Sequence, residues 1–281
     1  STVYRSSKLA PMSGVVYGRM DMKYMPLIFQ SKTGVETANL QISEISPCAA
    51  ARWCDQLYAT LPPLKYQAPQ DRMKLLPKTL KAMKSGKPWR VVMLGDSIIN
   101  DTFNSNFQAL LKRNYPKSDL EFICSVRGST GCWYYQDPAQ FKKYVTDLNP
   151  DLLIIGGISQ RNDIAAIKKV IARAKKLNCE IMLMTGPMNE DWRPYDKNKP
   201  DAPLKKQIWT HKMIPGKRMQ PTKLAAVAKE FNIEFLDMKS PWQIYLGASG
   251  KPWRWFHRDR VHANDRGKQI IGRILTRYMT K

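Results

Sequence analysis

The chain has 281 residues, of which 43% are hydrophobic, so it can bury a substantial core and a largely disordered protein is not expected. Its 46 Lys and Arg against 23 Asp and Glu give a formal charge of +23. This surplus indicates an acidic partner, such as an anionic polysaccharide or nucleic acid, with a basic but solvated exterior as the alternative interpretation. The longest apolar runs are far too short to cross a bilayer, so membrane insertion is not expected.

The first part of the chain is broken into short pieces without a sustained hydrophobic period. We interpret residues 1–88 as an N-terminal extension that wraps on the main domain, with a small β-rich appendage as the alternative. Its last part, Asp71–Lys84, has the pattern of a short amphipathic helix. The prolines that interrupt residues 1–88 are Pro11, Pro26, Pro47, Pro62, Pro63, Pro69 and Pro77.

After Pro88 the pattern changes to short apolar runs that alternate with helical stretches. This alternation predicts a doubly wound parallel sheet covered on both faces, a three-layer α/β/α sandwich with five strands. The predicted strands are Arg90–Leu94, Leu120–Val126, Asp151–Ile155, Glu180–Thr185 and Ile233–Asp237. The predicted helices lie near Asn104–Asn114, Ala139–Leu148, Ile164–Leu177, Thr222–Phe231 and Asp265–Tyr278. In such sheets, sites form at the carboxyl ends of the strands.

Gly95-Asp96-Ser97 follows the first predicted strand directly. A turn at this place would hold a serine hydroxyl at the open edge of the sheet, near backbone N–H groups. The hydroxyl becomes a good nucleophile only when a base removes its proton. The triplet alone is weak support, because the same residues suit any turn or helix cap.

A candidate for this base lies near the C-terminal end of the sequence. Asp259 and His262 lie three residues apart on a predicted loop before the last helix, and at this spacing the carboxylate can fix the tautomer of the imidazole. His262 would then act as general base toward Ser97 and as general acid toward the leaving group. His257 is the competitor for this role.

Together these two segments resemble the first and last blocks of the SGNH/GDSL hydrolases, and the resemblance covers residues 89–281. It implies a flavodoxin-like three-layer fold and ester hydrolysis through Ser97, Asp259 and His262, with no metal and no organic cofactor. The Val261-His262-x-Asn264-x-x-Gly267 context matches the family at His262 better than at His257.

The family also implies an oxyanion hole made by the N–H of the nucleophile, a glycine after the second strand and an asparagine after the third. Here Ser97 supplies the first donor, and Gly131 fits the second block better than Gly128. The third block departs from Gly-x-Asn-Asp and reads Gly156-Gly157-Ile158-Ser159-Gln160-Arg161-Asn162-Asp163. We rank Asn162 first as the third donor, then Gln160, with Ser159 at the expected place. Helix capping by Asn162 or Asp163 is the alternative.

Two segments, residues 188–216 and 239–258, are longer than loops between the elements of such a sheet need to be, and both are rich in aromatic and basic side chains. Aromatic rings suit sugar rings, while Arg and Lys suit carboxylate or sulfate. The predicted substrate-binding residues are Trp253, Arg254, Trp255 and Arg258. The tryptophans could instead anchor the second segment to the domain.

The five cysteines form no zinc-like pattern with the histidines. Cys48 with Cys54, and Cys124 with Cys132, could close small loops in an exported protein, and buried free thiols are the alternative. No signal peptide opens the sequence, but a trimmed mature protein would look the same, and we expect a secreted or periplasmic protein.

The leading hypothesis is a carbohydrate O-acyl esterase that acts on an acylated glycan, with a deacetylase favoured and an anionic polysaccharide as a candidate substrate; the small acyl group rests on analogy with the family. The same residues would also serve a lipase, thioesterase or acyltransferase. A hypothesis of another class is a glycan- or polyanion-binding protein on an inactive hydrolase scaffold. No specific nucleic-acid binding is expected, because no recognised motif is present.

Overall fold

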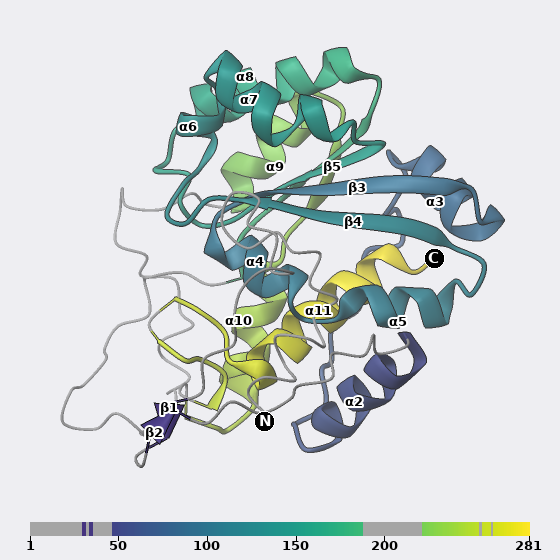
Figure 1. Ribbon diagram of the computed structural model, residues 1–281, viewed down its shortest axis with the longest axis vertical. Coiled ribbons are helices and arrows are strands. Elements are labelled where there is room, and N and C mark those ends of the chain that lie inside the picture. Colours follow the sequence, from purple (N-terminus) through teal and green to yellow (C-terminus); the bar gives the residue numbers. More distant parts are fainter. Residues whose placement is uncertain (1–29, 32–33, 36–46, 188–220, 253–254, 260) are drawn as a thin grey trace.

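A central sheet of five parallel strands organises the main part of the computed structural model (Figure 1), which describes residues 30–31, 34–35, 47–187, 221–252, 255–259 and 261–281. Its order is β4-β3-β5-β6-β7, with crossovers that return the chain to both sides of β3. The strands are β3 (Pro88–Gly95), β4 (Asp119–Val126), β5 (Leu152–Ile155), β6 (Glu180–Met184) and β7 (Glu234–Leu236). The predicted doubly wound parallel sheet is confirmed.

Alternating side chains of each strand enter two separate apolar cores. On β3, Val91 and Met93 belong to one core, while Val92 and Leu94 belong to the other. The four residues of β5 are all buried. Burial on both faces explains why these strands are continuous apolar runs in the sequence, since neither face meets water.

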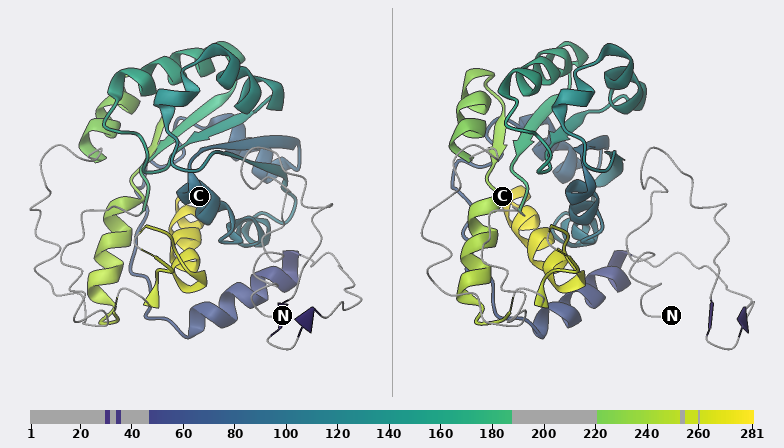
Figure 2. Two further views of the ribbon diagram at one scale, coloured as in Figure 1. Left: turned by 60° about the vertical axis from the view of Figure 1, so that its left-hand side comes forward. Right: turned by 90° about the vertical axis from the view of Figure 1, so that its left-hand side faces the viewer.

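Helices cover both faces of the sheet, as Figures 1 and 2 show. One layer packs on the core that contains Val92 and Leu94. It comprises α6 (Cys132–Tyr135), α7 (Pro138–Tyr144), α8 (Ile164–Ala174) and α9 (Pro221–Glu230), with the 3-10 turns η2 (Thr146–Leu148) and η3 (Lys175–Leu177). The other layer packs on the core that contains Val91 and Met93, and comprises α3 (Pro77–Ser85), α4 (Ser97–Phe103), α5 (Phe107–Asn114), α10 (Lys239–Ala248) and α11 (Asp265–Met279). The three-layer α/β/α arrangement is thereby confirmed.

Helix α2, within residues 1–88, packs on this second layer. In α2 (Pro47–Ala59), the buried residues Ala50, Ala51 and Cys54 contact Ala109 and Leu110 of α5. Two further strands, β1 (Gln30–Ser31) and β2 (Gly34–Val35), form a short antiparallel pair. The division of the chain at residue 88 stays a prediction.

The helix expected at Asp71–Lys84 begins only at Pro77. Proline lacks an N–H and is tolerated at the first helical position but not in the interior. The preceding backbone is held in another way, because the N–H groups of Met73 and Leu75 donate to the buried carboxylate of Glu234, at 2.7 and 2.9 Å. The prediction was wrong for residues 71–76.

Two other elements differ from expectation. The helix predicted near Asn104–Asn114 is α5, which begins at Phe107 after Asn106 in a left-handed conformation with φ 59°. It is preceded by α4 (Ser97–Phe103), a helix that the sequence patterns did not predict. The segment 239–258 is not one long loop, because its first half forms α10. Trp242 and Tyr245 of this helix are buried against the core.

All five cysteines are free thiols, so neither of the two small loops is closed by a disulfide. Cys48 and Cys54 lie on the same helix, α2. Burial raises the pKa of the Cys54 thiol to about 11, which keeps it protonated and unreactive near neutral pH. Within the described residues, no helix is both long and apolar enough to cross a bilayer.

Candidate active site

Ser97 is the first residue of α4 and follows β3 without an intervening loop. Asp96 caps this helix: its Oδ1 accepts a hydrogen bond from the N–H of Ile98 at 2.9 Å. Its Oδ2 accepts from the N–H groups of Ile158 and Ser159, at 2.8 and 2.7 Å. The fully buried Asp96 carboxylate therefore fixes the nucleophile turn to the loop after β5.

Two contacts hold this turn in place. The hydroxyl of Tyr135 donates to the carbonyl of Gly95 at 2.6 Å, and its oxygen accepts from the N–H of Arg127 at 3.0 Å. Gly157 has a φ of 95°, and a Cβ there would lie 2.5 Å from the Asp96 Oδ1. The loops after β3, β4 and β5 are thus joined tightly at one edge of the sheet.

Gly157→Ala is expected to lower the free energy of unfolding by about 1–3 kcal/mol, because it adds an unfavourable φ to a collision with a buried carboxylate. Gly250 is the matched control, since its φ is 64° but a Cβ at this residue would have no atom within 4 Å. Urea unfolding of both variants separates the two causes. Equal destabilisation by both alanines would contradict the collision.

The loop before α11 is a tight hairpin that carries Asp259 and His262. His257 and Ala263 pair across it, and the N–H of Arg258 donates to the carbonyl of His262 at 3.0 Å. The Asp259 Oδ1 accepts from the backbone N–H groups of Val261 and His262, both at 2.9 Å. The Asp259 side chain is therefore held in place by backbone groups of its own loop.

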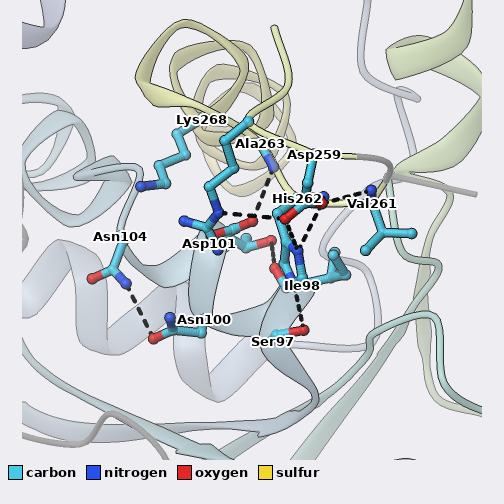
Figure 3. A network of polar contacts seen from close by, with 12 residues as sticks. Ser97, Ile98, Asn100, Asp101, Asn104, Asp259, Val261, His262, Ala263 and Lys268 are labelled. Carbon is cyan, nitrogen blue, oxygen red and sulfur yellow. Dashed lines mark hydrogen bonds and ion pairs between the residues drawn. The ribbon is translucent and has the colours of Figure 1, made fainter. Parts of the chain in front are cut away.

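The structure brings the three predicted catalytic side chains together (Figure 3). His262 Nδ1 lies 2.8 Å from Asp259 Oδ2, and His262 Nε2 lies 2.7 Å from Ser97 Oγ. The imidazole thus bridges carboxylate and hydroxyl, the arrangement in which a carboxylate holds the Nδ1–H tautomer and leaves Nε2 to accept the serine proton.

Asp259 is set up to remain ionised. Partial burial raises the pKa of its carboxyl, but hydrogen bonds from the N–H groups of Val261 and His262, and from the His262 ring, outweigh that cost. The net result is a pKa below its ordinary value. The group that would stabilise a protonated imidazole is therefore charged at any pH near neutrality.

His257, the competing histidine, is not placed for this role. It is buried, and its ring packs edge-on against Trp242 with the ring centroids 5.5 Å apart. Its neighbour Phe256 is fully buried as well. Phe256 and His257 therefore anchor the hairpin to the core, and His262 is the histidine that contacts Ser97.

Asp101 is a further residue of the site, and no sequence motif predicts a role for it. It lies one helical turn after Ser97 on α4, and its side chain is 1% exposed. Its Oδ2 accepts from the N–H of Ala263 at 3.0 Å, and its Oδ1 lies 3.2 Å from Arg258 Nη2. Asp101 therefore ties the nucleophile helix to the hairpin of His262. An acidic residue four positions after the serine was the available signal, but it has meaning only once a helix is known to begin at Ser97.

The donors predicted for an oxyanion hole differ in whether they already form hydrogen bonds within the protein. Within the described part of the chain, the backbone N–H groups of Ser97 and Gly131 donate to no protein acceptor. The Gln160 amide is engaged elsewhere: Nε2 donates to the carbonyl of Gly156 at 3.0 Å, and Oε1 accepts from the N–H of Cys132 at 2.9 Å. Among the described residues, these two backbone N–H groups are thus free to bind a substrate oxygen, whereas the Gln160 side chain is not.

Asn162 lies in a left-handed backbone conformation, with its Oδ1 3.5 Å from Lys223 Nζ on α9. Asp163, not Asn162, caps α8, because its Oδ1 accepts from the N–H of Ala166 at 2.9 Å. The assignment of Asn162 or Gln160 as third donor stays a prediction.

Of the predicted substrate-binding residues, Trp253 and Arg254 lie outside the described residues, as does the whole segment 188–216. Trp255 packs against the core, with Lys251 Nζ and Arg266 Cζ each 4.6 Å from its ring centroid. These contacts fit the anchoring interpretation. Arg258 has its charge balanced by Asp101. Among the described residues, no three His, Cys, Asp or Glu side chains gather as metal ligands would.

The fold and this geometry define an α/β protein with a serine, a histidine and an aspartate aligned in hydrogen-bond contact. No family model and no curated protein matches the sequence. Solved structures share the fold. One is a two-domain esterase (CEX) active on acetylated mannans, with 16% identity and a TM-score of 0.56 over 74% of this chain and 52% of that one. The present chain therefore spans about half the length of that esterase.

A second similar structure is the acetylxylan esterase Axe2 from Geobacillus stearothermophilus, with 18% identity and a TM-score of 0.51, over 70% of this chain and 97% of that one. Its structures include catalytic mutants in which a histidine, an aspartate or a serine is replaced by alanine. At these identities the likeness establishes a common fold.

Proposed function

We propose that this protein is a serine esterase of the SGNH/GDSL type that removes O-acetyl groups from a carbohydrate. The observation that carries the proposal is the contact of Ser97 Oγ with His262 Nε2 at 2.7 Å, with Asp259 behind the imidazole. The fold it shares with esterases for acetylated mannan and xylan supports the substrate class. In the acetylxylan esterase, the aspartate and histidine of the catalytic mutants are three positions apart, the spacing of Asp259 and His262.

The proposed reaction has two halves. His262 Nε2 takes the proton of Ser97 Oγ, and the oxygen attacks the acetyl carbonyl carbon. The negative oxygen that forms would accept from the N–H groups of Ser97 and Gly131, and losing one such donor typically costs about 2.7–4 kcal/mol. When the ester C–O bond breaks, the protonated His262 gives its proton to the departing sugar oxygen. Water then repeats these steps on the acetylated Ser97 and releases acetic acid.

Gly131 is suited to this role by its lack of a side chain. A Cβ at this residue would lie 2.5 Å from the carbonyl oxygen of Ser159 and 2.9 Å from Gln160 Oε1. Only glycine allows the loops after β4 and β5 to approach so closely. The N–H of Gly131 is thereby held on the loop beside the nucleophile turn.

Two measurements on the same protein test the proposal: acetate release from p-nitrophenyl acetate and acetylated mannan, and labelling by a serine-directed phosphonate. We expect the wild type to show both, and Ser97→Ala to show neither. Ser85→Ala is the matched control, because Ser85 is exposed at the end of α3, next to the opposite end of β3. It should retain both.

A folded wild type that neither hydrolyses an ester nor takes the label would contradict the proposal. Glycan binding with a steep salt dependence and no turnover would then favour the polyanion-binding alternative, which the charge of +23 supports. Labelling of Ser97 without acetate release would retain the serine mechanism but point to a lipase, thioesterase or acyltransferase. The proposal includes a secreted or periplasmic location, where an enzyme would meet an extracellular polysaccharide.

A further inference from the structure

The loop after β5 carries an arginine that is stacked on an aromatic ring beside the candidate active site. Arg161 Cζ lies 3.6 Å from the centroid of the Trp133 ring, and Arg161 is exposed. The indole itself is fixed, because its Nε1 donates to the carbonyl of Ser159 at 2.9 Å. A guanidinium that lies over an aromatic ring keeps the N–H donors at its edge free to bind a ligand.

Short stretches of chain connect the Arg161–Trp133 pair to the reacting groups. Ser159 is two residues before Arg161, and its N–H donates to Asp96, the neighbour of Ser97. On the other side, Trp133 is two residues after Gly131, a proposed oxyanion donor. Arg161 thus comes from the loop after β5, and Trp133 comes from helix α6, which follows the loop after β4.

The charge of Arg161 is not balanced by the described part of the chain, where no carboxylate forms an ion pair with it. The nearest acid along the chain, Asp163, is occupied in capping α8. Lys223 Nζ lies 3.5 Å from Asn162 Oδ1, so a second cation contacts the same loop. The loop therefore presents a cation that no acid among the described residues neutralises.

A second arginine is held in the same way on the next aromatic residue. Arg127 Cζ lies 4.5 Å from the ring centroid of Tyr134, and the rings of Trp133 and Tyr134 are in edge contact at 6.2 Å. Both arginines thus rest on the short helix α6. Arg258 differs, because Asp101 already balances it.

From these contacts we propose that Arg161, carried by Trp133 and supported by Arg127, binds an anionic group on the sugar chain next to the acetylated position. This rests on the proposed esterase function and defines its substrate class as an acidic glycan. A planar guanidinium fork binds two oxygens of one carboxylate or sulfate at once, which a lysine cannot do. Arg161 then selects the substrate, while Ser97 and His262 perform the chemistry.

The test compares kcat/KM for acetate release from acetylated polygalacturonate, acetylated dextran sulfate and acetylated mannan. In the wild type, we expect one or both anionic polymers to exceed the neutral one, and their ranking distinguishes carboxylate from sulfate. Arg161→Gln should lower the ratio of anionic to neutral kcat/KM by about 10- to 100-fold, the scale of losing a hydrogen bond to a charged group. Arg161→Lys should recover only part of it.

Lys169→Gln is the control for overall charge, because Lys169 is exposed on α8 and the change removes one positive charge as well. Its ratio should stay at the wild-type value. An unchanged ratio in Arg161→Gln, or an equal fall in Lys169→Gln, would overturn the anionic subsite. Equal use of acidic and neutral esters by the wild type would also overturn it while leaving the esterase intact. A wild type without any ester turnover would instead remove the proposed function on which the subsite rests.

Binding separates the two proposals further. On a Ser97→Ala background, unacetylated polygalacturonate and dextran sulfate should bind more tightly than mannan, and adding Arg161→Gln should weaken binding of the preferred polyanion by a similar factor. This readout does not depend on catalysis. Unaltered polyanion binding in that double variant would count against the subsite even if the esterase is active.

Discussion

Asp259→Asn is expected to lower kcat for ester hydrolysis by roughly 10³- to 10⁴-fold without unfolding the protein. The amide oxygen of asparagine can still accept from the N–H groups of Val261 and His262, as Asp259 Oδ1 does at 2.9 Å. The amide nitrogen would then face His262 Nδ1, which must become an acceptor. Nε2 would carry the proton and could no longer take one from Ser97.

The pH profile of kcat/KM provides a second readout of this variant. Since its hydrogen bonds hold the pKa of Asp259 below its ordinary value, the carboxylate does not titrate between about pH 5 and neutrality. The acid limb of the wild-type profile is therefore not set by Asp259, and the variant should lower the plateau far more than it moves that limb. Asp265→Asn, in the first turn of α11, is the matched control and should keep at least half of the activity. A loss below about tenfold in Asp259→Asn would mean that another group orients His262.

The fold was predictable because the central strands of the sheet are buried on both faces. The run Leu152–Ile155 is apolar at every position, and the strands next to it in the sheet are also mostly apolar. The strands could therefore be predicted without an alternating pattern of polar and apolar residues. Helix α10 was harder to predict. Pro241, Gly247 and Gly250 suggest a loop, but Pro241 stands in the first turn, where proline is tolerated. The aromatic residues Trp242 and Tyr245 of this helix are buried in the core, so they stabilise the fold.

The candidate site was predictable only where a motif is local in sequence. Asp259 and His262 meet within one hairpin, and Ser97 follows directly from a recognisable strand. Contacts between loops carry no such signal. That Gln160 joins Gly156 to Cys132 follows from how closely the loops after β4 and β5 approach, and sequence spacing does not encode that distance. The role of Asp101 was hidden for the same reason.

Asp101→Ala is expected to lower the free energy of unfolding by about 2–4 kcal/mol, because it leaves the buried N–H of Ala263 without an acceptor and opens a cavity. Arg258 loses its ion pair as well, but it is 44% exposed and can be solvated. The hairpin of His262 would be released from α4, so kcat should fall about 10- to 100-fold through misplacement of the imidazole. Glu121→Gln, which breaks the exposed pair with Arg90, is the control and should cost less than about 1 kcal/mol.

Asp101→Asn separates the charge of this residue from its size. Burial raises the pKa of Asp101, and Arg258, Lys268, His262 and the N–H of Ala263 offset only part of that rise. A carboxyl with a raised pKa binds its proton more tightly in the folded than in the unfolded state. Its contribution to stability is therefore greatest below the unfolded pKa of about 4 and declines as the pH rises through the folded value.

The asparagine variant cannot titrate at this position, so its stability relative to the wild type should improve as the pH rises from about 4 toward neutrality. Urea unfolding at pH 4, 5.5 and 7 measures that difference directly. If the wild type gained on the variant over this range, the ion pair with Arg258 would outweigh burial, and Asp101 would be a stabilising charge. With the expected trend, the buried carboxylate costs stability near neutral pH, and its retention follows from the position it gives His262 at the nucleophile.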